Sequence, residues 1–178
     1  MIDKFKYSDK ELNEIIKSMV ILVDRREHKG VNQHILDYFD KKGINYKSKS
    51  LKYGDYSFYL PKNEEFGIVR DMYFDKDIVI ERKNSLEELS QNFTTERDRL
   101  EKEFALAPKH KVLLIENATY GDVVMGNYKT QYNEKSYWAS LHSMWHRYDI
   151  PVIFMPDKKF TGCFMRGYFT YYLREYLR

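Results

Sequence analysis

Residues 77–83 read Asp-Ile-Val-Ile-Glu-Arg-Lys, and the interpretation of the chain starts from this stretch. Its three consecutive β-branched apolar residues predict a buried strand. Because side chains alternate along a strand, Glu81 and Lys83 project from one face and Arg82 from the other. A carboxylate beside an ammonium at the end of a buried strand indicates either a simple ion pair or a site that binds an ion. The strand alone leaves both interpretations open.

Two further carboxylates follow predicted strands elsewhere in the chain. Asp55 comes directly after a glycine at a tight turn, and Asp24 ends a short apolar strand. Hydrolysis of a phosphodiester needs hard oxygen ligands for Mg²⁺ or Mn²⁺, typically two carboxylates with water and the substrate phosphate. A lysine close by can hold the water or the phosphate as a point charge. Asp55, Glu81 and Lys83 supply this set and favour a metal-dependent nuclease site.

The remaining pattern predicts a single α/β domain over 1–178, with its core at about 20–156. Strands alternate with amphipathic helices after a central meander, which predicts a mixed sheet with helices on both faces. The stretch 61–77 is expected to form an extra hairpin or loop. The predicted strands are 20–23, 44–53, 55–60, 77–83, 111–116 and 151–155. The predicted helices are 8–18, 31–42, one capped by Ser85, 95–107, 134–147 and 164–177.

Composition limits the class of protein. The 178 residues are 43% hydrophobic and 32% charged, as in an ordinary globular domain. Cys163 is the only cysteine, which excludes an internal disulfide and a cysteine-based zinc site. No apolar run is long enough to span a bilayer, and charges interrupt the N-terminal residues where a signal peptide would be apolar. We therefore expect an intracellular, cytoplasmic and DNA-associated protein, although the net charge of +3 does not by itself argue for nucleic acid.

Three blocks of sequence, taken in order, resemble the nuclease domain of the XPF-type structure-specific endonucleases. Residues 23–27 (VDRRE), 51–56 (LKYGDY) and 80–83 (IERK) match the blocks V-D-x-R-E, L-x-x-G-D-Y and x-E-R-K. The resemblance covers roughly 20–156, and three blocks in order are far more specific than one. It implies a restriction-endonuclease-like fold, Mg²⁺ or Mn²⁺ as cofactor, and cleavage of DNA near branches.

The resemblance also implies roles for individual residues. Asp55 and Glu81 resemble the metal ligands, joined by the backbone carbonyl of Arg82, and Lys83 resembles the catalytic lysine. Asp24 is similar to an accessory carboxylate that binds metal or orients water.

Other matching positions are expected to support this site. Arg26 and Glu27 are expected to brace it. Glu87 occupies the position of a family aspartate six residues after Glu81 and keeps its charge on a longer side chain. The basic residues expected to contact DNA are Arg82, Arg97 and Arg99.

The chain departs from the family in two respects. The segment between Asp55 and Glu81 is longer than in animal and archaeal members, with 61–77 as the insertion. No pair of glycines has the G-x-G spacing that a helix-hairpin-helix module requires. This compact layout resembles the single-domain relatives of bacteria and their viruses. Family members pair through their nuclease domains, so a homodimer is expected as well.

Three hypotheses of function follow. The leading one is an endonuclease that hydrolyses flap, fork or junction DNA with Mg²⁺ or Mn²⁺. The alternative is a non-catalytic DNA-binding or scaffolding subunit with the same fold, although inactive relatives typically lack the acidic set that is present here. The third, an ion-pair network in an unrelated α/β protein, requires the three-block match to be accidental.

Overall fold

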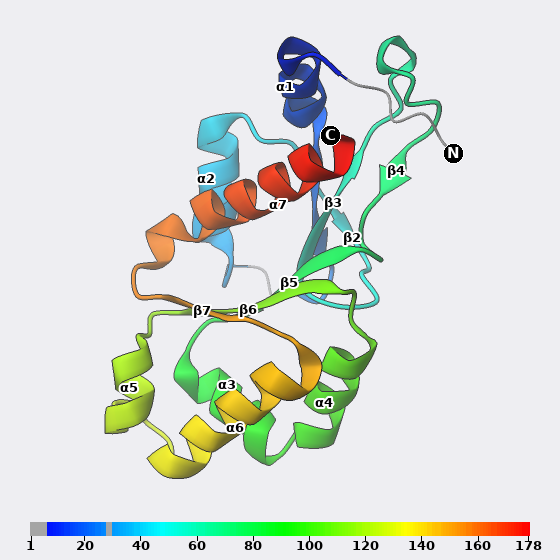
Figure 1. Cartoon of the computed structure of the whole chain (residues 1–178). Coiled ribbons are helices and arrows are strands. Elements are labelled where there is room, and N and C mark those ends of the chain that lie inside the picture. Colours follow the sequence, from blue (N-terminus) through cyan, green and yellow to red (C-terminus); the bar gives the residue numbers. More distant parts are fainter. Residues whose placement is uncertain (1–6, 28–29) are drawn as a thin grey trace.

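The chain folds as a mixed sheet between two layers of helices, as a computed structural model describes it for residues 7–27 and 30–178 (Figure 1). Helices α1, α2 and α7 cover one face of the sheet, and α3, α4, α5 and α6 lie on the other. The expected α/β sandwich with helices on both faces is thus confirmed. No described helix is long and apolar enough to cross a membrane.

The sheet has the strand order β2-β1-β3-β5-β6-β7, with β4 paired to β3. Strand β3 is antiparallel to both β1 and β5, while the pairs β1–β2, β5–β6 and β6–β7 are parallel. The strands are β1 (Val20–Asp24), β2 (Tyr46–Lys49), β3 (Tyr56–Leu60), β4 (Met72–Tyr73), β5 (Ile78–Lys83), β6 (His110–Glu116) and β7 (Val152–Met155).

This topology brings distant segments to one edge of the sheet. Strands β1 and β5 run in the same direction because each is antiparallel to β3, which lies between them. Strand β6 is parallel to β5. The carboxyl ends of β1, β5 and β6 therefore meet at the edge where β3 begins, and each of these strands ends in a charged residue.

The first helix layer packs a large apolar core against the sheet. It consists of α1 (Asp9–Ser18), α2 (Gln33–Lys42) and α7 (Thr161–Leu177). Phe39 of α2, Phe58 of β3, Ile80 of β5 and Phe169 of α7 are fully buried in this core. The rings of Phe58 and Phe169 lie 5.4 Å apart, so the closing helix is tied directly to the centre of the sheet.

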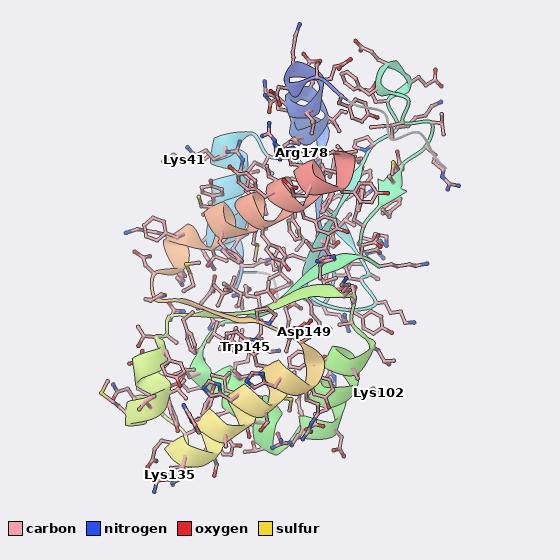
Figure 2. All side chains as sticks on the ribbon, viewed as in Figure 1. Lys41, Lys102, Lys135, Trp145, Asp149 and Arg178 are labelled. Atoms are coloured by element: carbon pink, nitrogen blue, oxygen red, sulfur yellow. The ribbon has the colours of Figure 1, made fainter. Side chains whose placement is uncertain are left out.

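The second layer forms a separate buried cluster. It consists of α3 (Leu86–Thr94), α4 (Arg97–Leu106), α5 (Tyr120–Met125) and α6 (Glu134–Tyr148). Its apolar residues pack on β6 and β7, where Leu113, Ile115 and Val152 are buried. Exposed lysines such as Lys41 on α2 and Lys135 on α6 lie on the outer surfaces of the two layers (Figure 2).

Most element boundaries follow from local chemistry. The capping box predicted at Ser8 is present, with Glu11 bonded back to the Ser8 backbone. Gly43 ends α2 in the left-handed conformation that favours glycine. The insertion forms a short 3-10 turn at Glu64–Phe66 and then β4, which pairs with the end of β3, so of the expected hairpin or loop it is a hairpin.

Several boundaries differ from the sequence expectation by one to four residues, and one helix was not expected. Strand β2 stops at Lys49, because the residues after it turn towards the end of β1, where the Leu51 amide bonds to Asp24. Helix α7 begins at Thr161, three residues early, after a 3-10 turn at Lys158–Phe160. The short helix α5 was not expected, although Thr119 and Asp122 form a capping box at its start.

Candidate active site

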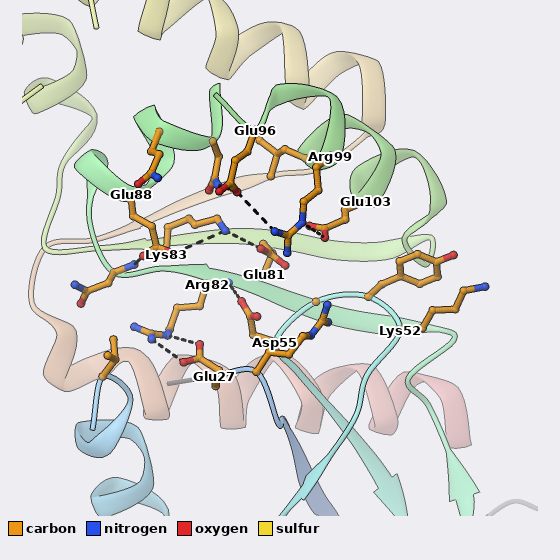
Figure 3. A pocket seen from close by; sticks show the side chains of 18 residues that line it. Glu27, Lys52, Asp55, Glu81, Arg82, Lys83, Glu88, Glu96, Arg99 and Glu103 are labelled. Carbon is orange, nitrogen blue, oxygen red and sulfur yellow. Dashed lines mark hydrogen bonds and ion pairs between the residues drawn. The ribbon is translucent and has the colours of Figure 1, made fainter. Parts of the chain in front are cut away.

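A polar cleft of about 530 Å³ lies at the edge of the sheet where β1 and β5 end and β3 begins. Its floor carries Asp55, Glu81 and Lys83, and α3 and α4 form a wall (Figure 3). Both acidic and basic residues line it. The acidic residues are Glu27, Asp55, Glu81, Glu88, Glu96 and Glu103, and the basic residues are Arg26, Lys52, Arg82, Lys83 and Arg99. The structure thus brings together the three residues on which the nuclease hypothesis depends.

Asp55 is held between β1 and β5 by its own backbone. Its amide donates to the Ile80 carbonyl at 2.8 Å, and its carbonyl accepts from the Asp24 amide at 2.8 Å. Its carboxylate accepts from the Arg82 backbone amide at 2.8 Å. These bonds fix both the position of the residue and the direction of its side chain.

Gly54 allows the turn before Asp55 to approach β5 this closely. Its φ is +68°, a region that other residues adopt at a cost. A Cβ atom there would lie 2.8 Å from the Cβ of Val79 and 3.1 Å from the Ile80 carbonyl oxygen. The glycine of the G-D-Y block is therefore required for two reasons: its positive φ and the lack of space for a Cβ atom.

The charge of Asp55 is poorly compensated. Burial raises the pKa of Asp55 well above its ordinary value, and the neighbouring carboxylates of Glu81 and Glu27 raise it further. The ammonium of Lys83 and the hydrogen bond from Arg82 oppose this rise without cancelling it. A further positive charge beside Asp55 would relieve the conflict.

Glu81 and Lys83 face the cleft together, as the alternation of β5 predicts. The Nζ atom of Lys83 lies 2.9 Å from Oε1 of Glu81 and 3.8 Å from Oε1 of Glu88 (Figure 3). Burial lowers the pKa of Lys83, but the charges of Glu81 and Asp55 outweigh it and hold the pKa above its usual value. Lys83 is therefore a firmly charged ammonium on the cleft floor.

Arg82 points away from Glu81 and Lys83, and its role differs from the expected DNA contact. Its side chain is 3% exposed, and the guanidinium forms a two-point contact with Glu27, at 3.1 Å from Nε to Oε1 and 3.0 Å from Nη2 to Oε2. A third bond, from Nη1, reaches Glu116 at 2.8 Å. With these bonds made, the side chain is not free for phosphates, and we assign it to positioning. Glu27, which was expected to brace the site, is itself held by Arg82 and lines the cleft.

The position of Asp24 does not favour its expected role as an accessory carboxylate that binds metal or orients water. Its fully buried carboxylate accepts from the Arg26 amide at 2.7 Å, the Arg26 Nε at 2.8 Å and the Leu51 amide at 2.6 Å. Burial would raise the pKa of Asp24, but these hydrogen bonds outweigh it and keep the pKa below its usual value. Asp24 is not among the described residues that line the cleft, so we assign it to bracing the 50–55 turn.

Glu87 does not take the place expected for the family aspartate. Its carboxylate accepts from the Lys129 amide at 2.8 Å, outside the cleft. The adjacent Glu88 lines the cleft, near Lys83, and accepts from the Asn84 amide. Neighbouring residues of a helix point about 100° apart, so only one of Glu87 and Glu88 can face the cleft. The six-residue spacing from Glu81 did not identify which one, because the chain turns at Asn84 before the helix begins.

The two arginines of α4, Arg97 and Arg99, lie in different surroundings. Arg99 lines the cleft, paired with Glu103 at 3.2 Å, as expected for a residue that could meet phosphates. Arg97 lies outside this cleft and ties α4 to α6 through Ser140. The position of Arg97 does not favour the expected DNA contact.

The donor set of the cleft fits a hard divalent cation. Among the described residues, no three His, Cys, Asp or Glu side chains are already close enough together to hold an ion. Mg²⁺, however, commonly takes only one or two carboxylates and completes its shell with water and phosphate. Asp55 and Glu81 offer two carboxylates in one cleft, and the unfavourable charge on Asp55 is the kind that a cation neutralises.

Comparison with known proteins agrees with the fold and with the three blocks. A family model described as the ERCC4 domain matches residues 23–166, a span that contains all three blocks. The resemblance found in the sequence is thus confirmed. Comparison with curated proteins finds no match.

Two solved structures share the fold. XPF from Aeropyrum pernix aligns with a TM-score of 0.60 and 19% identity, covering 87% of this chain and 65% of that chain. XPF from Aeropyrum pernix in complex with DNA aligns with a TM-score of 0.60 and 18% identity, covering 88% and 66%. This chain therefore spans about 65% of the length of those proteins. At such identity the likeness concerns the fold, and it confirms the restriction-endonuclease-like architecture.

The close approach at Gly54 can be tested against a matched glycine. Gly67 has a similar φ of +71°, but no atom lies within 4 Å of the position that a Cβ atom would take there. Gly67→Ala should therefore lower the free energy of unfolding only by the conformational cost, about 1–2 kcal/mol. Gly54→Ala should lower it by about 1–3 kcal/mol more, because its methyl group overpacks against β5. Urea unfolding of both variants measures the difference, and equal losses would refute the close approach.

The charge conflict at Asp55 predicts that Asp55→Asn stabilises the metal-free protein at neutral pH. The folded-state pKa of Asp55 lies above its unfolded value, so ionised Asp55 opposes folding at neutral pH. Asparagine avoids this cost and can still accept from the Arg82 amide. The gain should shrink as the pH falls towards 3.8, the ordinary value. Urea unfolding in EDTA across this range checks it, and a variant less stable than wild type at neutral pH contradicts it.

Proposed function

Because the chain belongs to the ERCC4 domain family, we propose that it is a metal-dependent DNA endonuclease that hydrolyses phosphodiester bonds. One observation carries the proposal: Asp55, Glu81 and Lys83 come from two separate segments and converge in one cleft at the sheet edge. The first two supply oxygen ligands and the third supplies a fixed positive charge. These are the groups that metal-assisted hydrolysis requires.

Mg²⁺ or Mn²⁺ is the proposed cofactor. Asp55 and Glu81 would hold it, with the backbone carbonyl of Arg82 as a further oxygen ligand. When bound, such an ion supplies a more acidic water and neutralises charge on the phosphate. Binding would also offset the burial and the repulsion by Glu81 that together raise the pKa of Asp55.

The side chains of the cleft provide the remaining chemistry. Lys83, charged and directed into the cleft, can hold the attacking water or a phosphate oxygen. Arg26, whose side chain is 59% exposed, Lys52 and Arg99 line the cleft and can attract the DNA backbone. Arg99 would have to exchange its carboxylate partners for phosphates to do so.

DNA is the proposed substrate, and branched DNA is the proposed preference. A structure of the same fold is described as an XPF in complex with DNA. The preference for flaps, forks or junctions rests on the sequence resemblance to XPF-type enzymes. An intracellular, DNA-associated location follows from this substrate. A non-catalytic scaffolding role is disfavoured, because the acidic pair and Lys83 are all present and face one cleft.

Cleavage of end-labelled DNA tests the proposal. The wild-type chain should cut flap, fork or junction DNA with Mg²⁺ or Mn²⁺ and lose this activity in EDTA. Glu81→Gln should lower the cleavage rate at least about 100-fold, because it removes a charged oxygen from the reacting centre.

Glu65→Gln is the matched control, because Glu65 is exposed on the inserted turn. This variant should cut DNA at the wild-type rate. If the wild type binds DNA but cuts none of the substrates with either metal, the scaffolding role is correct and the endonuclease proposal is wrong.

A homodimer is the proposed assembly. Large apolar side chains are exposed on α5 and α6, next to β7 at the end of the strand order. They are Tyr120, Val124, Met125 and Trp138, at 43%, 50%, 68% and 46% exposure. Exposed apolar groups gathered on one surface mark interfaces.

Light scattering tests this assembly. The wild type should have twice the chain mass, and Met125→Glu should dissociate it because a charge would be buried in the interface. A wild type that is monomeric at micromolar concentration contradicts the dimer.

A further inference from the structure

We propose that Glu116, buried beneath the cleft, is a positioning residue that fixes the two cleft carboxylates Glu27 and Asp55 through Arg82. Thr161 and His34 complete the assembly by holding Glu116. The inference rests on the proposed function, since it concerns the geometry of the same metal-binding cleft.

Glu116 ends β6 at the edge where the cleft lies, and its side chain is fully buried. Each carboxylate oxygen has partners. Oε2 accepts from Arg82 Nη1 at 2.8 Å. Oε1 accepts from the Thr161 hydroxyl at 2.5 Å and lies 2.7 Å from His34 Nε2. Three elements, β5, α2 and α7, are thus joined at one carboxylate.

Arg82 transmits this arrangement to the cleft in two ways. Its guanidinium contacts both oxygens of Glu27, and its backbone amide donates to Asp55. Glu27 and Asp55 both line the cleft, while Glu116 does not. A shift of Arg82 would therefore move two cleft carboxylates at once.

The energetics favour orientation over stability as the reason for this network. Taking charges out of water costs several kcal/mol per ion, and buried ion pairs often add little net stability. Here two carboxylates share one arginine, all with side chains at most 7% exposed. What such an arrangement supplies is a single fixed geometry, because each displaced member leaves a buried charge unpaired.

The N-terminus of α7 adds to the anchor. Thr161 is the first residue of this 17-residue helix, and its hydroxyl is fully buried against Glu116. A negative charge near the start of a helix is stabilised by the helix dipole. The C-terminal helix thereby contributes to the cleft without a residue in it.

The experiment measures Mn²⁺ binding by electron paramagnetic resonance, together with DNA cleavage, in Glu116→Gln and Thr161→Val. A glutamine at 116 directs an amide N–H at one of the donors that a carboxylate satisfies, and a valine at 161 removes one donor. Each variant should bind Mn²⁺ about 10-fold or more weakly and lower kcat by a similar factor, with KM for DNA nearly unchanged. Thr161→Ser, which keeps the hydroxyl, should restore both values.

Thr119→Val is the matched control for stability. It removes a threonine from the N-terminus of α5, where Thr119 caps the helix away from the cleft. It should lower the melting temperature and leave Mn²⁺ affinity unchanged. If Glu116 had a merely structural role, Thr161→Val would behave like this control, and Glu116→Gln would bind Mn²⁺ as tightly as the wild type. These results would overturn the inference.

The two proposals can fail separately. If the wild type binds Mn²⁺ but cuts no DNA, the endonuclease proposal fails, and the Mn²⁺ affinities still decide the role of Glu116. If the wild type cuts DNA and the variants keep wild-type affinity and kcat, the positioning role fails alone. A wild type that neither binds Mn²⁺ nor cuts overturns both.

Discussion

The hydrogen bond from the Arg82 amide to the Asp55 carboxylate is the contact on which the cleft depends. It joins the turn before β3 to the end of β5, and it exists because antiparallel pairing places these two ends at one edge of the sheet. Gly54 lets the turn come close enough. Alternation along β5 then sends Glu81 and Lys83 into the cleft and the Arg82 side chain behind it.

The cleft has a charge arrangement that folding alone would not favour. The carboxylate of the half-buried Asp55 lies near two other carboxylates, and its pKa is raised because ionising it in this place is unfavourable. Proteins often place such unfavourable groups where they bind ligands or carry out chemistry. The charged groups around Asp55, including the ion pairs of Arg82 and Lys83, lie at one edge of the sheet. The two apolar cores, one on each face of the sheet, stabilise the fold.

The sequence predicted the sheet, both helix layers and the floor of the cleft, because these depend on periodicity and on order along the chain. Asp55, Glu81 and Lys83 could be identified since strand alternation is strictly local. The roles of Asp24 and Glu87 could not, because they depend on which neighbour satisfies each carboxylate. Glu116 was overlooked for the same reason, although a glutamate that ends a run of four apolar residues is a signal of a buried charge.

The central claim is that Asp55 and Glu81 together hold a divalent ion, and anomalous diffraction from crystals soaked in MnCl₂ tests it most directly. The account predicts a manganese peak in the cleft, in contact with a carboxylate oxygen of each residue, with Lys83 beside it. Manganese bound elsewhere, or a cleft without it at saturating MnCl₂, would contradict the account.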